Sequence, residues 1–272
     1  MTPPARLRLP GVTPLEVWDL PVGNERLWQR VGSARLETLA ATGRRVSNIV
    51  AGFLEAIRAA WPGLCGRAGV APSRLLLAGG LTGLPGFAEA ASSMLGALAR
   101  VAVLPGGAHG ALAAGAPDEL VLDIGQTAAK AGLGSLRVTL PRDAACPVVV
   151  VERQATMTAA ERESAGAAAE AFFTRCLKQA LSLGTPRRIL LGLPVELDDE
   201  LVPGACTYAG LAGRRGLVRA MVEGAGAMAP LLACNDAELA ALAARNLGMA
   251  GPGTTLLLTL GFGPGAARLE SP

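Results

Sequence analysis

Three apolar runs in this chain each lead directly into a glycine turn. They are Arg74–Ala78 before Gly79, Leu120–Ile124 before Gly125, and Thr254–Leu260 before Gly261. Short apolar runs bounded by turn residues are typical of buried strands, and in α/β sheets the carboxyl ends of such strands form the ligand crevice. The chain is therefore expected to be an α/β protein with its glycine turns gathered at strand ends.

Composition narrows the class of protein. The 272 residues are 51% hydrophobic but only 3% aromatic, so the core must be built from Ala, Leu, Val and Gly. The formal charge of +3 is weak and scattered, which predicts neither a nucleic-acid partner nor an acidic membrane surface. The five cysteines are far apart and form no Cys-x-x-Cys pair, which argues against a disulfide scaffold or a structural zinc site.

The N-terminus does not resemble a targeting signal. Two prolines stand where a signal peptide needs its apolar run, and no segment approaches about 18 consecutive apolar residues. We therefore expect a reduced, cytoplasmic protein that does not insert into a membrane. A homodimer is left open.

Hydrophobic periodicity predicts alternating strands and helices. Expected strands are Leu15–Val22, Arg74–Ala78, Val101–Leu104, Leu120–Ile124, Ser135–Leu140, Pro147–Glu152, Arg188–Val195, Ala229–Ala233 and Thr254–Leu260. Expected helices are Arg35–Ala60, Gly86–Ala99, Gly110–Ala114, Thr158–Leu183, Gly216–Glu223 and Asp236–Leu247, the fourth beginning with a Thr158/Glu161 capping box.

The turn Asp123-x-Gly125-x-Thr127 is the first candidate for chemistry. Small residues after a strand let backbone amides approach phosphate oxygens, and the aspartate can hold hydrated Mg²⁺ near the phosphates. The alternative is a plain strand ending in a turn. Gly261-Phe262-Gly263 would supply the opposite side of a phosphate clamp. Gly79-Gly80 with Leu81 would supply a third nucleotide-binding turn, and the Gly83 and Gly86 that follow lead into a helix that could flank an adenine.

These segments resemble the ROK family of sugar kinases and repressors, within the actin, hexokinase and chaperone ATPase superfamily. DIGQTAAKAGL is similar to the family's opening DIGGTKIxxGL. CNDAELAALAARNLG followed by TTLLLTLGFGPGAA is similar to its ENDAN helix and LTLGTGxGGG turn. EVWDLPV, RLETLA and LLLAGGLTGLPGF resemble later blocks of the family, but here they come first.

Each block occurs once, in cyclic order, so the resemblance implies a circularly permuted chain. The implied fold class is α/β, with two ribonuclease-H-like (actin-like ATPase) domains around a nucleotide cleft. Residues 1–118 would be the ordinary second domain moved to the front. Residues 119–272 would be the ordinary first domain, with the phosphate motifs and the catalytic aspartate.

The resemblance also assigns roles at the site. Asp236 would be the general base that removes a proton from a sugar hydroxyl. Asn235, Glu16 and Glu37 would bind other sugar hydroxyls, with Asp19 beside them. Simpler structural roles stay open: Asn235 and Asp236 as a helix cap, and the two glutamates as solvated residues.

Several positions depart from the family pattern. Asp19, Trp28, Arg30 and Arg35 stand at or near the positions of the family's four zinc ligands, so no zinc is expected. Gln126 and Phe262 add bulk beside the presumed phosphates. Lys130 is interpreted either as a phosphate contact or as a solvated strand residue. The leading hypothesis is an ATP- and Mg²⁺-dependent hexose kinase.

Two other functions stay open. One is a catalytically silent module that binds a sugar or nucleotide and acts through a partner. The other is an ATPase with an acceptor other than a sugar.

Overall fold

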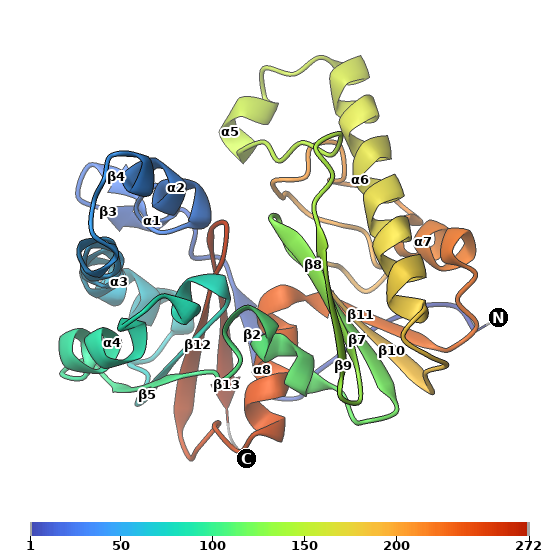
Figure 1. Ribbon diagram of the computed structural model, residues 1–272. Helices are drawn as coiled ribbons and strands as arrows, with labels where there is room; N and C mark the ends of the chain where they lie inside the picture. The colour runs from blue at the N-terminus through green and yellow to red at the C-terminus, as the bar shows by residue number, and fades with distance from the viewer. Residues whose placement is uncertain (1, 271–272) are drawn as a thin grey trace. The chain divides into compact units, whose positions relative to one another are not determined.

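The computed structural model describes residues 2–270 and divides the chain into two compact units (Figure 1). Unit 1 comprises Met1–Arg8 and Ala114–Leu239, and unit 2 comprises Leu9–Ala113 and Ala240–Pro272. Each unit has its own sheet and its own hydrophobic core. The chain is a mixed α/β protein, as the sequence predicted.

Unit 1 is built on a six-stranded sheet in the order β1-β11-β10-β7-β8-β9. The strands are β1 (Ala5–Arg6), β7 (Glu119–Ile124), β8 (Ala128–Leu133), β9 (Leu136–Pro141), β10 (Arg188–Leu193) and β11 (Leu231–Asn235). Strands β1, β11, β10 and β7 run parallel, while β8 and β9 continue from β7 as antiparallel neighbours.

Two helices, α6 (Ala159–Leu181) and α7 (Leu217–Ala225), pack on one face of this sheet (Figure 1). Leu120 and Leu122 of β7 share a core with Phe173 and Met221 of these helices. The predicted capping box of α6 is confirmed, because the Thr158 side chain accepts from the Glu161 amide and the Glu161 carboxylate accepts from the Thr158 amide. The short α5 (Val151–Gln154) precedes α6, and α8 (Asp236–Asn246) follows β11.

Unit 2 is built on a five-stranded sheet in the order β2-β13-β12-β5-β6. The strands are β2 (Val12–Leu15), β5 (Arg74–Ala78), β6 (Arg100–Val103), β12 (Thr254–Leu260) and β13 (Pro264–Glu270), with a separate hairpin of β3 (Pro21–Val22) and β4 (Glu25–Arg26). The helical segments are α1 (Leu27–Arg30), α2 (Ser33–Ala41), α3 (Val46–Ala68), α4 (Phe87–Leu95), and the 3₁₀ turns η1 (Gly80–Gly83) and η2 (Gly107–Ala114).

Helix α3 is long and apolar enough, by length and composition, to cross a membrane. In the structure its inward face is part of a protein core. Ile49, Phe53 and Ile57 are buried together with Leu75 of β5 and Leu258 of β12. The structure therefore uses α3 as a core helix of unit 2.

The two sheets repeat one pairing pattern. In unit 1, β7 is antiparallel to β8, β8 is antiparallel to β9, and β10 and β11 follow on the other side in parallel. In unit 2, β12 has β13 and β2 as its antiparallel series and β5 and β6 as its parallel series. Strand β1 of unit 1 is an addition to this pattern, because no strand of the described unit 2 takes the corresponding place.

The grouping of residues 240–272 differs from the predicted division at residue 118. These residues were expected to fold with residues 119–239. They instead join unit 2, because β12 pairs with β5 and β13 pairs with β2.

Three element predictions were wrong. Pro147–Glu152 is not a strand, since the antiparallel neighbour of β7 is β8, which pairs in turn with β9 through a hairpin at Gly134. The expected helix Arg35–Ala60 is two helices, because Gly43 takes a φ of +72° after α2. The expected strand Leu15–Val22 is replaced by β2 and β3 with an irregular segment between them.

At the ends of the paired strands β5 and β12, Gly79 packs closely against the backbone of Leu260, and this contact tests the architecture of unit 2. Gly79 has a φ of +97°, and a Cβ there would lie 2.6 Å from the Leu260 carbonyl oxygen. Gly43 also has a positive φ, but a Cβ there would meet nothing within 4 Å. Gly43→Ala should therefore lower the free energy of unfolding by about 1 kcal/mol, and Gly79→Ala by a further ~1 to 3 kcal/mol from the backbone clash. Chemical denaturation of both variants measures the difference, and equal losses would contradict the packing described.

Candidate functional site

Two aspartates lie on one face of the unit 1 sheet, at the carboxyl ends of its parallel strands. Asp123 near the end of β7 is in register with Gly192 of β10, and Gly192 is in register with Cys234 of β11. Asp236 is the first residue of α8, two positions after Cys234. A Cβ on Gly192 would lie 2.6 Å from the Leu239 side chain, so the first turn of α8 lies directly on this row. Because in-register residues share a face, the Asp123 side chain faces the same side as α8.

The charges of these groups act on one another. The pKa of Asp236 is raised to about 7, mainly because burial disfavours its charged form and then because of the negative charge of Asp123. The Ala237 amide, the Lys130 charge and the amide of Asp236 itself oppose the rise. A carboxyl group with this pKa changes protonation near neutral pH, which is the range in which a general acid or base works best.

Asn235 caps α8. Its side-chain oxygen accepts a hydrogen bond from the Ala237 amide at 2.8 Å, and its own amide donates to the Glu238 carboxylate at 2.9 Å. The capping role left open by the sequence is therefore confirmed for Asn235. Its role toward a sugar stays a prediction.

The Lys130 ammonium group lies next to the glycine turn that follows β7. It pairs across the sheet with Asp123, and its ammonium nitrogen lies 3.2 Å from where a Cβ on Gly125 would be. The side chain is half-buried and its charge acts on Asp236. Of the two interpretations offered by the sequence, this placement favours an ammonium directed at the turn.

The turn itself is held by its carbonyl groups. The Gly125 amide donates to the Ala128 carbonyl at 3.1 Å, and the Tyr208 hydroxyl donates to the Gly125 carbonyl at 2.8 Å. Arg142 donates from Nε to the Gln126 carbonyl at 2.7 Å and from its amide to the Thr127 carbonyl at 3.0 Å. In the described part of the chain, the amides of Gln126 and Thr127 make no hydrogen bond, which leaves two donors at the tip of the turn.

Sequence reasoning missed both supporting residues. Tyr208 is buried, and its ring lies edge-on to Phe173 with centroids 4.9 Å apart. Burial raises the pKa of its hydroxyl far above the usual value, so this group stays a hydrogen-bond donor. Tyr208 is the only tyrosine in the sequence, but its partner lies 83 residues away and no local pattern indicates the contact.

The other two glycine turns lie together in unit 2. Strands β5 and β12 are parallel neighbours, so Gly79–Gly80 and Gly261–Gly263 follow their adjacent carboxyl ends. Leu81 is buried in η1, which continues from Gly79. The loop before η2 approaches the same place, because a Cβ on Gly107 would lie 3.7 Å from Gly83. Gly107 has no local sequence signal that predicts its place beside these turns.

Helix α2 contacts the turn at Phe262. The Ser33 amide donates to the Gly261 carbonyl at 2.9 Å, and a Cβ on Gly32 would lie 2.1 Å from the Phe262 carbonyl oxygen. Gly32 is therefore needed for this close approach. Phe262 and Gly263 are half-buried.

The three remaining predicted acids belong to unit 2 and differ in their surroundings. Glu16 follows β2 and is exposed, and Glu37 is exposed on α2. Asp19 accepts hydrogen bonds from Arg67 of α3, at 3.2 Å to each carboxylate oxygen. Asp19 is thus engaged by a cation, whereas the two glutamates face solvent.

The donor set near Asp123 suits a hydrated Mg²⁺ ion. Mg²⁺ keeps most of its waters and binds proteins through one or two carboxylates together with substrate phosphates. The mutual effect of Asp123 and Asp236 provides the negative potential that such an ion would neutralise. Among residues 2–270, no group of three or more His, Cys, Asp or Glu side chains is placed to hold a metal by itself.

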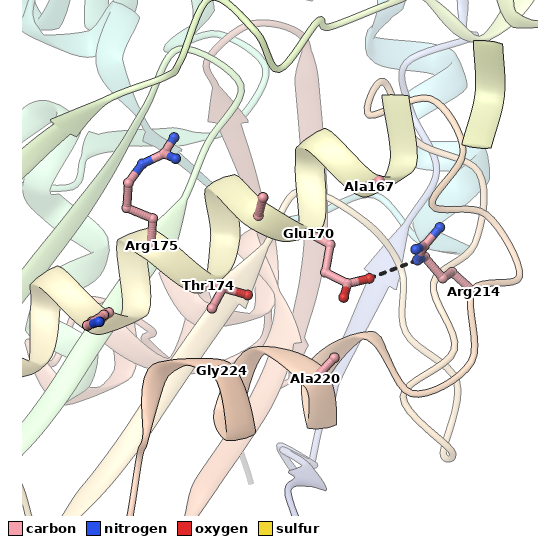
Figure 2. A pocket seen from close by; sticks show the side chains of 9 residues that line it. Ala167, Glu170, Thr174, Arg175, Arg214, Ala220 and Gly224 are labelled. Atoms are coloured by element: carbon pink, nitrogen blue, oxygen red, sulfur yellow. Dashed lines mark hydrogen bonds and ion pairs between the residues drawn. The ribbon is translucent and has the colours of Figure 1, made fainter. Parts of the chain in front are cut away.

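A groove of about 490 Å³ lies between α6 and α7 (Figure 2). Small residues form its floor, including Ala167, Thr174, Ala220 and Gly224, and Arg214 at its rim is paired with Glu170 at 2.9 Å. Both helices share the core of Leu120 and Leu122, which alternate with Asp123 along β7. The groove is therefore on the opposite face of the sheet from Asp123 and is not part of the candidate site.

The influence of Asp123 on Asp236 can be measured directly. Asp123→Asn removes the neighbouring negative charge, so the pKa of Asp236 should fall from about 7. The measurement is a carbon-13 NMR titration of protein labelled at aspartate carboxyl groups. Asp199→Asn, at an exposed ion pair with Arg8, is the control and should leave the midpoint unchanged. An unchanged midpoint in the Asp123 variant would show that the two carboxyl groups do not interact.

A scan against protein-family models and a search of curated proteins find no match to this sequence. Among solved structures, the chain is similar to an inorganic polyphosphate/ATP-glucomannokinase from Arthrobacter sp. strain KM, with 22% sequence identity and a TM-score of 0.40. The alignment covers 56% of this chain and 58% of that chain, so it spans little more than half of the neighbour's length.

Proposed function

We propose that the protein is an ATP- and Mg²⁺-dependent sugar kinase of the ROK type, with Asp236 as the general base. The observation that carries this proposal is the Asp236 carboxyl group, whose pKa is raised to about 7 beside Asp123 at the carboxyl ends of parallel strands. Carboxyl groups with strongly shifted pKa values cluster at functional sites. The ligand crevice of an α/β sheet lies at this same edge.

We also propose that the chain is circularly permuted, with one ribonuclease-H-like domain in each unit. The repeated pairing pattern of the two sheets supports this idea. In unit 1 the pattern follows chain order from β7 to β11. In unit 2 it begins at β12 and β13 and resumes near the N-terminus with β2, β5 and β6. A chain cut between β13 and β2 accounts for that order.

In the proposed reaction Asp236 removes the proton from the attacking sugar hydroxyl. A pKa of about 7 leaves a large share of the carboxyl groups ionised at neutral pH and makes them stronger bases than an ordinary aspartate. Phosphoryl transfer depends mainly on positioning and charge neutralisation. The Lys130 ammonium and the Gln126 and Thr127 amides would bind phosphate oxygens. A Mg²⁺ ion at Asp123 would supply further positive charge when bound.

The remaining predicted residues complete the proposal. Glu16, Glu37 and Asn235 would bind sugar hydroxyls, since carboxylate and amide oxygens accept several O–H bonds. The turns that contain Gly79, Gly80, Leu81, Gly261, Phe262 and Gly263 would bind the nucleotide. Asp19 would have to give up its ion pair with Arg67 to bind a sugar hydroxyl, so we expect it to contribute least to sugar binding.

A catalytically silent binding module is the second candidate. Two contacts favour it: Asp19 binds Arg67, and the side-chain oxygen of Asn235 caps α8. Both contacts reduce the number of groups available to bind a sugar. Calorimetry with ATP and Mg²⁺ separates the two candidates. Binding without turnover across a panel of hexoses and N-acetylhexosamines would support the silent module.

Replacement of Asp236 by Asn tests the kinase. Sugar-dependent ADP release should fall by about 10² or more, because the variant has no general base. Full activity in this variant would remove Asp236 from the mechanism. Asp199→Asn is the matched control at an exposed carboxylate and should keep its activity.

The same variant should be more stable than the wild type at about pH 8. The folded-state pKa of Asp236 is about 7, above the reference value of about 3.9, so the folded protein binds this proton more tightly than the unfolded chain does. The contribution of Asp236 to the free energy of unfolding therefore falls as pH rises from about 4 to about 7. Asn lacks this decline. Thermal unfolding of both proteins at acidic and alkaline pH measures the difference, which should be smallest at about pH 4.

A further inference from the structure

The first residues of the chain are built into the unit 1 sheet. Strand β1 pairs in parallel with β11, with Ala5 opposite Leu232 and Arg6 opposite Ala233. The Leu7 amide extends this pairing to the Ala233 carbonyl at 2.7 Å. Strand β1 therefore lies beside the strand that leads into Asp236.

The Arg6 guanidinium is almost fully used. Its Nη2 nitrogen donates to both oxygens of Glu238, at 2.7 and 2.5 Å. The guanidinium also donates to the backbone carbonyls of Leu197 at 3.2 Å and Leu7 at 2.7 Å. The side chains of Arg6 and Glu238 are only 12% and 5% exposed. Because the other guanidinium nitrogens are bound to backbone carbonyls, the nitrogen that faces Glu238 is held in place, and its charge strengthens the hydrogen bonds to that carboxylate.

Glu238 also binds the backbone of Asn235, the residue before Asp236. The carboxylate oxygen that is 2.5 Å from Arg6 also accepts the Asn235 amide at 2.9 Å. Asn235 in turn caps α8 through the Ala237 amide. The backbone on both sides of Asp236 is thus held by a network that begins at Arg6.

We propose that Arg6 is a positioning residue for Asp236. It acts by neutralising Glu238 and by holding that carboxylate against the Asn235 amide. The proposal rests on the proposed function, because it gives Arg6 its importance through the general base. It adds a role for β1, the strand that has no counterpart in the described part of unit 2.

Charged groups other than Arg6 and Glu238 also surround Asp236. Asp123 on β7 and Lys130 on β8 act on it with opposite signs. Burial raises the pKa of the Cys234 thiol on β11, the charge of Glu238 raises it further, and the charge of Arg6 lowers it. Without Arg6, Glu238 becomes a buried carboxylate with no counter-charge, which disturbs the contact that holds the Asn235 amide.

The test compares Arg6→Met with Arg8→Met in the full-length protein. Arg8 lies two residues away in an exposed ion pair with Asp199, with side chains 72% and 74% exposed, and serves as the matched control. Arg6→Met should lower kcat about 10-fold or more while leaving KM for ATP within about twofold, since small displacements of a reacting group are costly. Arg8→Met should change neither constant by more than about twofold.

A double variant separates positioning from simple stabilisation. Arg6→Met with Glu238→Gln removes both charges and keeps an oxygen that can accept the Asn235 amide. Its thermal stability should recover toward that of the wild type, because no unpaired charge remains buried. Its kcat should stay low, because the guanidinium that holds residue 238 in place is missing. Recovery of kcat together with stability would overturn the proposal. If Arg6→Met does not fold, the double variant alone decides.

A second measurement does not depend on activity. In hydrogen–deuterium exchange, Arg6→Met should speed exchange of the Asn235 amide that donates to Glu238, and Arg8→Met should not. A wild-type protein that phosphorylates no sugar refutes the proposed function, and this exchange measurement still tests the network. Exchange of the Asn235 amide in Arg6→Met at the wild-type rate would refute the role of Arg6.

Discussion

The first turn of α8 packs directly against Gly192 of β10, where the sheet has no side chain, and the candidate site depends on that contact. At Gly192 a Cβ would lie 2.6 Å from the Leu239 side chain. Any larger residue would push the first turn of α8 away from the sheet. Asp236 lies in that turn, so its distance from Asp123 is set by the absence of a side chain on β10. The electrostatic coupling of the two acids follows from this packing.

A half-buried acid beside another acid destabilises a folded protein, and nearby groups offset only part of that cost. Lys130 and the amides at the start of α8 favour the ionised form of Asp236, yet its pKa remains raised to about 7. Glu119 of the same sheet shows the contrast. It is also buried, but Arg187 and Arg188 both bind its carboxylate. Glu119 belongs to a structural ion pair, whereas Asp236 has a pKa that lets its protonation change near neutral pH.

Much of the fold could be predicted from local sequence. The apolar runs before Gly79, Gly125 and Gly261 are strands, as predicted, because apolar character and a following glycine are local signals. The prediction failed where the signal was weak or where pairing decided the outcome. Strand β8 is rich in Ala and Gly and lacks β-branched residues, so Pro147–Glu152 was preferred to it.

Long-range partners were invisible to sequence reasoning. Arg6 binds a residue 232 positions away, and Tyr208 binds one 83 positions away. No periodicity or motif links such pairs, because they meet only when β1 joins β11 and when the segment before α7 packs under the Gly125 turn. The aspartates were found from their motifs. The groups that orient and charge them needed the folded structure.

Strand β1 covers an edge of the unit 1 sheet beside the proposed general base. A strand edge without a partner invites pairing with another chain unless a segment of the same chain covers it. Here the segment pairs with β11, and its Arg6 is buried against Glu238. The edge that needed covering is the edge of the strand that leads into Asp236. Thus the residue that neutralises Glu238 comes from the strand that covers this edge, and the geometry of the proposed base depends on that strand staying in place.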